Sequence, residues 1–205
     1  LWYSYPKLPT RESAMKVAAA RDWSHSVGGA LAVDSPRAMF RILEMLHRHG
    51  IPELAQDYLG EEPVLSATKF MLWRVPGEGP TAGWHQDGRF LGDDLATPHV
   101  RTAPSERGED APGMDLVLDY LDHYIMPDTE SHFDWSVSDA QVDAMRDRVS
   151  VVTPKFKAGD MVMFDNWLLH RTARRPGMTK TRYAIESWFF APSKFPIGRT
   201  ALLAR

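Results

Sequence analysis

The chain has 205 residues, a mass of 23.2 kDa and a formal net charge of −3 at pH 7. Hydrophobic residues make up 43% of the sequence and charged residues 25%, which excludes disordered, collagen-like and coiled-coil chains. The lack of cysteine excludes disulfide scaffolds, thiolate metal sites and cysteine nucleophiles. A pI near 6.3 offers no basic field for nucleic acid, and no apolar run approaches the roughly 20 residues of a membrane-spanning helix. We therefore expect a cytoplasmic protein with no nucleic-acid partner.

The first 60 residues are predicted to form a mostly helical flank. Apolar residues recur at helical spacing over residues 36–49, Asp34 or Ser35 can cap the start, and Gly50 ends the run. A shorter helix is predicted over residues 53–59. No repeat or linker separates this flank from the rest of the chain, so we expect one domain.

From residue 63 the sequence changes to short apolar segments between clusters of glycine, proline and aspartate, which is typical of a β-sandwich or barrel. The longest predicted strand covers residues 64–75. The other apolar segments lie at Val100 and at residues 116–118, 149–152, 161–164 and 183–190. The sequence thus predicts a mainly β domain over residues 1–205, with flanking α-helices and a barrel core at residues 63–192.

Insertions are predicted near residues 90–148 of this core. Residues 90–112 show little periodicity and mixed charge, so we expect a long loop with one strand inside it, acting as a lid. Residues 138–149 predict a helix with Ser138 as its N-cap.

A His-x-Asp pair, His85 and Asp87, follows a turn rich in proline and glycine. On a strand, residues i and i+2 point to the same face, so these side chains could serve one metal ion. Nitrogen and oxygen donors without sulfur suit iron(II). The alternative is that His85 is an ordinary surface or hydrogen-bonded histidine.

A second His-x-Asp pair, His132 and Asp134, follows an acidic, turn-rich segment at residues 127–131. Such a segment is typical of an exposed loop. We therefore expect this pair to lie on the surface and to bind no metal.

A third ligand is predicted after the apolar segment at residues 161–164. Residues 165–166 break that strand, and the next apolar run ends in His170. A barrel can bring His170 beside His85 and Asp87, and two histidines and one carboxylate would leave three adjacent iron positions open for substrate and oxygen. Alternatively, His170 only ends a strand and bonds a backbone carbonyl.

Arg182 begins a predicted strand whose side chains alternate between two faces. The face expected to pack beneath the N-terminal helices carries Tyr183, Ile185, Ser187 and Phe189. The other face carries Arg182, Ala184, Glu186 and Trp188. A dry core would not accept an arginine without a partner, so an inward Arg182 indicates a polar pocket with an anionic ligand. The alternative is an outward Arg182 on an edge strand.

Charge balance supports this combination. Iron(II) with one aspartate ligand keeps a single positive charge, and Arg182 adds a second. A 2-oxo dicarboxylate that binds the metal at one end and Arg182 at the other would cancel both charges, which matters in a barrel of low dielectric constant.

Together these segments resemble a known family. Residues 84–88 (Trp-His-Gln-Asp-Gly), residues 159–165 running to His170, and then Arg182 are similar in order and spacing to the phytanoyl-CoA dioxygenase family of iron(II)/2-oxoglutarate oxygenases. The resemblance covers residues 64–192. It implies a double-stranded β-helix, a cupin-like jelly-roll barrel flanked by N-terminal helices.

The resemblance also implies roles for individual residues. His85, Asp87 and His170 would be the iron ligands, and Arg182 would pair with the distal carboxylate of 2-oxoglutarate. Thr172 stands two residues after the distal histidine, where the family commonly has a hydroxyl group that helps to bind that carboxylate.

Three further positions follow from the resemblance. Met71 matches a position that lines the 2-oxoglutarate site. Arg101 is a departure, because relatives often have an aromatic residue on this strand. Asp87 favours hydroxylation, since halogenating relatives lack this carboxylate.

The function that the resemblance implies is that of an Fe(II)/2-oxoglutarate-dependent dioxygenase. With O2 it would convert 2-oxoglutarate to succinate and CO2 and hydroxylate an unactivated C–H bond of a small metabolite or natural-product intermediate. Trp84, Phe90 and Trp135 are the predicted substrate contacts. Two alternatives are a non-catalytic jelly roll that binds a small molecule, and a cupin-type metal hydrolase or isomerase.

Overall fold

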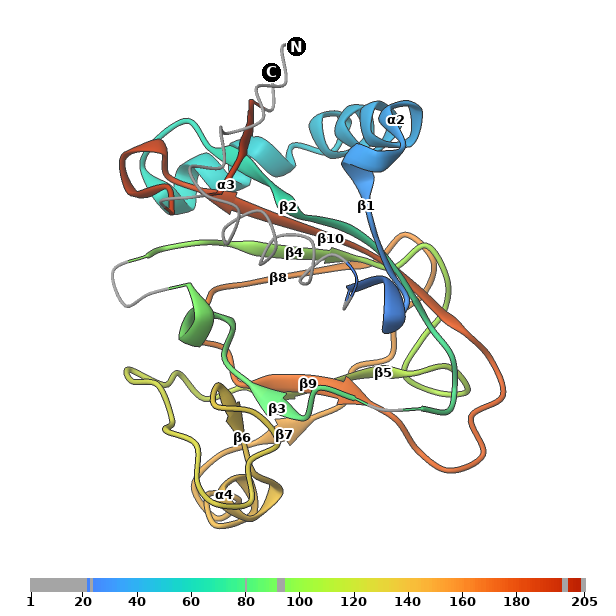
Figure 1. The fold of residues 1–205 in the computed structure, drawn as a ribbon, viewed down its shortest axis with the longest axis vertical. Coiled ribbons are helices and arrows are strands. Elements are labelled where there is room, and N and C mark those ends of the chain that lie inside the picture. The colour runs from blue at the N-terminus through green and yellow to red at the C-terminus, as the bar shows by residue number, and fades with distance from the viewer. Residues whose placement is uncertain (1–21, 23, 80, 92–94, 197–198, 204–205) are drawn as a thin grey trace.

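Two antiparallel sheets face each other in the computed structural model, which describes residues 22, 24–79, 81–91, 95–196 and 199–203 (Figure 1). The six-stranded sheet has the order β1 (Gly29–Leu31), β2 (Val64–Val75), β10 (Arg182–Phe190), β4 (His99–Thr102) and β8 (Met161–Phe164), and β11 (Ala201–Leu203) also pairs with β2. The five-stranded sheet has the order β6 (Ser136–Val137), β3 (Trp84–His85), β9 (His170–Ala173), β5 (Gly113–Val117) and β7 (Val151–Val152). The chain passes repeatedly between the sheets, which confirms the predicted mainly β jelly-roll fold.

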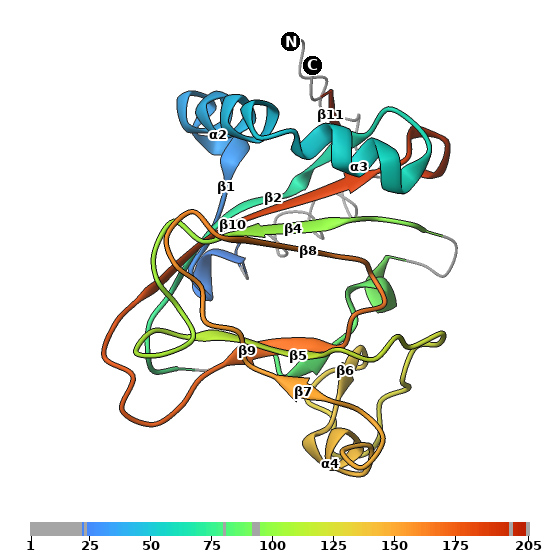
Figure 2. The same cartoon turned by 180° about the vertical axis from the view of Figure 1, so that it is seen from behind.

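The helices lie outside this barrel (Figure 2). The α-helices are α2 (Pro36–Arg48), α3 (Ile51–Leu59) and α4 (Asp139–Asp143), and the 3-10 helices are η1 (Ala32–Asp34), η2 (Asp87–Phe90) and η3 (Pro192–Lys194). Helices α2 and α3 cover the outer face of the six-stranded sheet, whereas α4 lies beyond the five-stranded sheet. No helix in the described part of the chain is long and apolar enough to span a membrane.

The helix predicted at residues 36–49 is α2, which ends at Arg48. Gly50 adopts the left-handed conformation, with a φ of 69°, and separates α2 from α3. Helix α3 begins at Ile51, two residues before the prediction, because Pro52 fits a first helical turn without losing a hydrogen bond.

A hydrophobic core joins these helices to the six-stranded sheet. Its helical members include Met39, Ile42, Leu43 and Leu46. On the sheet side, Phe70 of β2 and Phe189 of β10 are fully buried, and Ile185 packs against the same cluster. Burial of each large apolar side chain contributes about 1.5–3 kcal/mol. The predicted alternation along β10 is therefore confirmed at Ile185 and Phe189, whereas Tyr183 is 47% exposed.

The N-terminal flank contains a strand that the sequence did not predict. Strand β1 pairs antiparallel with β2, with Leu31 opposite Met71. Three residues are too few to show a period in the sequence. Residues 1–21 and 23 of the predicted helical flank lie outside the described residues.

The strand predicted within residues 90–112 is β4, but the chain after it does not form a free lid. The Ala103 N–H donates to the Asp160 carbonyl at 2.8 Å, and Arg107 and Phe156 exchange two backbone hydrogen bonds of 3.0 and 2.9 Å. These bonds fix residues 103–108 against the chain that leads into β8.

The helix predicted at residues 138–149 is confirmed only at its start. Ser138 and Gln141 form a capping box, but α4 ends at Asp143. Beyond it the chain forms turns with bonds between residues three apart, such as Arg146 N–H to the Asp143 carbonyl at 3.2 Å. Within α4 only Val142 is buried, so packing supports little more than one helical turn.

Candidate metal centre

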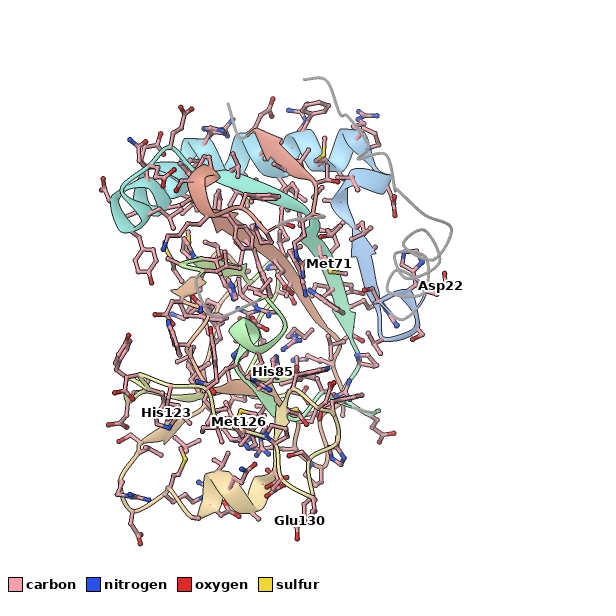
Figure 3. The ribbon with its side chains drawn as sticks, turned by 60° about the vertical axis from the view of Figure 1, so that its left-hand side comes forward. Asp22, Met71, His85, His123, Met126 and Glu130 are labelled. Atoms are coloured by element: carbon pink, nitrogen blue, oxygen red, sulfur yellow. The ribbon has the colours of Figure 1, made fainter. Side chains whose placement is uncertain are left out.

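The two predicted histidine ligands lie side by side in the five-stranded sheet. His85 on β3 and His170 on β9 are paired residues of adjacent strands, and their ring centroids are 4.4 Å apart. Figure 3 shows His85 between the two sheets, on the side that faces Met71 of β2. The strands therefore present both imidazoles to the interior of the barrel.

Asp87 completes the cluster, although it lies at the start of η2 and not on the strand that was predicted to carry it. Its Oδ1 atom is 3.5 Å from His85 Nε2, and its Oδ2 atom is 3.7 Å from His170 Nε2. One ligand atom from each of the three residues lies within 4.8 Å of the others. In the described part of the chain, this is the group of histidines and carboxylates that could hold a metal ion.

Hydrogen bonds orient both imidazoles for metal binding. His85 Nδ1 lies 2.9 Å from the Gly83 carbonyl, and His170 Nδ1 lies 3.0 Å from the Leu168 carbonyl. A carbonyl only accepts, so each Nδ1 donates its proton and each Nε2 keeps a lone pair. His170 Nε2 is buried and finds no hydrogen-bond partner among the described residues. A metal ion would satisfy this atom, so the donor set fits iron(II).

The protonation states also fit a metal ion. Burial, helped by the nearby His85, lowers the pKa of His170 to about 3, and burial lowers the pKa of His85 as well. Burial opposes the ionisation of Asp87, but the adjacent histidines outweigh it and hold the pKa of this carboxyl well below its usual range. Two neutral imidazoles and one carboxylate result, which is the form that binds metal.

His99 supports Asp87, and sequence reasoning did not single it out. Its Nδ1 atom donates to Asp87 Oδ2 at 2.8 Å, and the residue is fully buried. The ring stacks on Trp188, with centroids 3.8 Å apart and an interplanar angle of 8°. The only sequence signal for His99 is its position two residues before Arg101 on β4, which places both side chains on one face of the sheet.

Arg101, the departure from the family pattern, also faces the interior. Its Nη1 atom donates to Glu186 Oε2 at 2.7 Å, and its Nη2 atom lies 3.7 Å from Asp87 Oδ2. Trp73 Nε1 donates to the same Glu186 oxygen. The buried Glu186 thus has cationic and neutral donors, and Arg101 links it to the candidate metal centre.

Arg182 bridges the two sheets at one end of the barrel. From β10 its Nη1 atom donates to the Gly113 carbonyl at 2.8 Å, and its Nη2 atom donates to Thr172 Oγ1 at 3.5 Å. Arg182 is 6% exposed, so the predicted inward orientation is observed. Burial and the nearby arginines, Arg107 first, lower its pKa to about 9. Met71 is buried on β2, opposite Glu186 of β10.

The other residues that the sequence singled out differ in how close they lie to the candidate metal centre. His132 and Asp134 are exposed, as predicted. Trp135 lies edge-on to His85, with ring centroids 5.6 Å apart. Trp84 is wrongly predicted as a substrate contact, because it is buried in a separate core cluster and its Nε1 atom donates to Asp139. The side chain of Phe90 lies outside the described residues.

No protein-family model matches the sequence, and no curated protein matches it. Solved structures do match. Iron-bound EctD from S. alaskensis aligns over 95% of this chain and 74% of its own, with 15% identity and a TM-score of 0.58. The epimerase SnoN in complex with Fe3+, alpha-ketoglutarate and nogalamycin RO aligns over 89% of this chain and 75% of its own, with 15% identity and a TM-score of 0.57. The chain thus shares its jelly-roll fold with iron-bound EctD and with SnoN, whose structure holds iron and alpha-ketoglutarate.

A third neighbour aligns with the chain over part of its own length. AviO1 from Streptomyces viridochromogenes Tue57 is 20% identical over 73% of this chain, with a TM-score of 0.50. The chain spans 61% of the length of AviO1. At these identities the neighbours establish the fold alone.

Proposed function

We propose that the protein is a non-haem iron(II), 2-oxoglutarate-dependent oxygenase that hydroxylates an unactivated C–H bond of a small metabolite or natural-product intermediate. The observation that carries this proposal is the convergence of His85 Nε2, His170 Nε2 and the Asp87 carboxylate inside a jelly-roll barrel. When bound, iron(II) and 2-oxoglutarate would react with O2 and supply the oxidant for the C–H bond.

The protein's first task is to hold the metal in a defined orientation. The Gly83 and Leu168 carbonyls fix the tautomers of His85 and His170, and so both Nε2 atoms keep a lone pair that a metal ion could accept. Asp87 contributes the negative charge. With iron bound, three protein ligands would leave positions for a chelating 2-oxo acid and for oxygen, and Asp87 would take the ligand position that halogenating relatives leave free for halide.

The second task is to orient the 2-oxo acid. Arg182 and Thr172 lie together at the end of the barrel, and Thr172 shares a strand face with His170 because the two are separated by one residue. A guanidinium and a hydroxyl can bind the distal carboxylate while the 2-oxo end reaches the metal. Met71 borders the same interior from β2.

The substrate class is supported by the surroundings of the centre. Trp135 stands beside His85 and stacks on Phe133, with centroids 4.7 Å apart, which offers an aromatic surface next to a metal ligand. SnoN, which shares the fold, was crystallised with nogalamycin RO. Both observations favour a ring-containing natural product over a long acyl chain.

The test is O2 uptake and succinate formation by the iron(II)-loaded protein in the presence of 2-oxoglutarate, which enzymes of this type show slowly without a prime substrate. His85→Ala or Asp87→Ala should abolish Mn(II) binding, measured by calorimetry, together with succinate formation. His132→Ala is the matched control, since it removes an exposed histidine of the same sequence pattern, and it should change neither.

Loss of metal binding in His132→Ala would contradict the choice of centre. Mn(II) binding without 2-oxoglutarate turnover would favour a cupin-type hydrolase or isomerase. Binding of neither metal nor 2-oxoglutarate would favour a non-catalytic jelly roll.

A further inference from the structure

Arg107 is a buried arginine that takes no part in the function proposed above. It lies between β4 and β5 and is 2% exposed. Its Nη2 atom donates to the Arg101 carbonyl at 3.3 Å, and its guanidinium lies 4.2 Å from the centroid of the Phe156 ring. Its Nε and Nη1 atoms are buried without a hydrogen-bond partner among the described residues. In the same part of the chain, no carboxylate lies within 4.0 Å of it.

Two contacts place Arg107 beside Arg182. The Tyr183 N–H, next to Arg182, donates to Ser105 Oγ at 3.2 Å. On the other side, Gly108 packs so closely against Gly113 that a Cβ atom on Gly113 would lie 2.7 Å from Gly108 Cα. The Gly113 carbonyl is the acceptor of Arg182 Nη1. Residues 105–108 therefore pass directly along the buried arginine of β10.

Arg182, like Arg107, is a buried arginine without an ion-pair partner among the described residues. Its Nε atom is also buried without a partner among the residues described, and no carboxylate of the described chain forms an ion pair with it. Two guanidinium groups on neighbouring segments, both nearly inaccessible to water, thus present three N–H-bearing nitrogens without a partner among the described residues. Uncompensated buried charge is costly, and an anion would compensate it.

A carboxylate fits this set of donors. It has two oxygens and about four lone-pair directions, enough to accept from both arginines and from Thr172 at once. We propose that Arg107 and Arg182 together bind the distal carboxylate of the 2-oxo acid, so that Arg107 is a second cosubstrate-binding residue. This inference rests on the proposed function and specifies how that function selects a dicarboxylate.

The competing explanation is structural. The bond to the Arg101 carbonyl and the stacking on Phe156 could by themselves hold residues 103–108 in place. A role in stability alone would weaken the binding of every 2-oxo acid equally, whereas contact with the distal carboxylate affects only acids that possess one.

The experiment compares two acids on the Mn(II)-loaded protein by isothermal titration calorimetry. One is 2-oxoglutarate, and the other is 2-oxopentanoate, which has the same chain length and lacks the distal carboxylate. We expect Arg107→Met to raise the Kd of 2-oxoglutarate about 10- to 150-fold and to change the Kd of 2-oxopentanoate less than about twofold. Methionine keeps apolar bulk on Phe156, and Arg107→Lys, which keeps the charge, should recover part of the loss.

The controls separate the possible failures. Arg182→Met should show the same selective loss, and Arg41→Met, an exposed arginine on α2, should show none. If wild type and Arg182→Met behave as expected but Arg107→Met and Arg107→Lys bind 2-oxoglutarate like wild type, only the Arg107 inference is overturned. Equal weakening of both acids would also overturn it. If the wild-type protein with Mn(II) binds no 2-oxoglutarate, the proposed function falls with it.

Discussion

At the scale of single residues, the candidate metal centre depends on which side chains the two oxygens of the Asp87 carboxylate contact. Asp87 Oδ1 faces His85, and Asp87 Oδ2 accepts from His99 at 2.8 Å. Burial lowers the pKa of His99, so its imidazole is neutral and donates through Nδ1. Stacking on Trp188 fixes the plane of that ring. His99 is therefore a positioning residue, which acts on the metal only through Asp87.

Replacing His99 by phenylalanine tests this role. His99→Phe keeps a flat ring for Trp188 and removes the donor to Asp87, and partners of this kind are typically worth 10- to 100-fold in metal affinity. We expect the Kd for Mn(II) to rise by about tenfold or more, as measured by calorimetry. His132→Phe, a change at an exposed histidine, should leave it unaltered, and an unchanged Kd in His99→Phe would contradict the positioning role.

The sequence predicted the three members of the centre better than it predicted their support. His85, Asp87 and His170 could be proposed as ligands because a metal ion would require residues of these types, and the first two stand two residues apart. His99 and Arg107 carry no motif, because their importance comes from the pairing of β4 with β10 and from the path of residues 103–108. Such long-range pairing cannot be read from local periodicity.

At the scale of elements, Gln86 joins three segments around the centre. Its Nε2 atom donates to the His123 and Trp167 carbonyls at 3.1 and 2.9 Å, and its Oε1 atom accepts from the Ile125 N–H at 2.8 Å. Gln86 is fully buried and lies between His85 and Asp87. It therefore ties the start of η2 to the loop before β6 and to the turn before β9.

Gln86→Met should remove the hydrogen bonds that connect the start of η2 to the segments before β6 and β9. The substitution has similar volume and leaves two carbonyls and one N–H without partners, each unmet group costing about 1–3 kcal/mol. Three such groups together cost at least about 3 kcal/mol, so we expect the free energy of unfolding in urea to fall by about 3 kcal/mol or more. Gln56→Met, on the exposed face of α3, is the control and should change stability by less than about 0.5 kcal/mol. If Gln86→Met lowers the free energy of unfolding no more than the control does, Gln86 does not hold these segments together.

The same scale explains which elements the sequence could predict. Helix α2 and strand β2 are long and strongly periodic, and both match their predicted ranges closely. Strands β3, β6 and β7 have two residues each, and α4 has five, so none of them is long enough to show a period. The boundaries of these three strands are set by pairing within the five-stranded sheet.

At the scale of the whole molecule, the fold buries several ionisable groups. Asp87, His99, Arg107, Arg182 and Glu186 are all less than 9% exposed. Enclosing them disfavours the charged forms of the histidines, and this makes the stability of the fold depend on pH.

In the metal-free protein, this dependence has a definite sign. The folded pKa of His170 is about 3, and the pKa values of His85 and His99 are also lowered, whereas each would titrate near 6.5 in the unfolded chain. Above about pH 6.5 neither state binds these protons, so this contribution to stability is fully present. Below that pH the histidines bind protons in the unfolded chain but stay neutral in the folded barrel. The contribution to stability is therefore lost as the pH falls towards the pKa values of the folded state.

We therefore expect the free energy of unfolding, measured in urea with EDTA present, to decrease from pH 7 to pH 5. Each buried histidine contributes a slope of at most about 1.4 kcal/mol per pH unit, and carboxylates add little in this range because their unfolded pKa values lie near 4. His170→Gln removes one such group and should flatten the curve, while His132→Gln, at an exposed position, should leave the slope as it is. Identical slopes in wild type and His170→Gln would show that the folded barrel can accept a proton at His170.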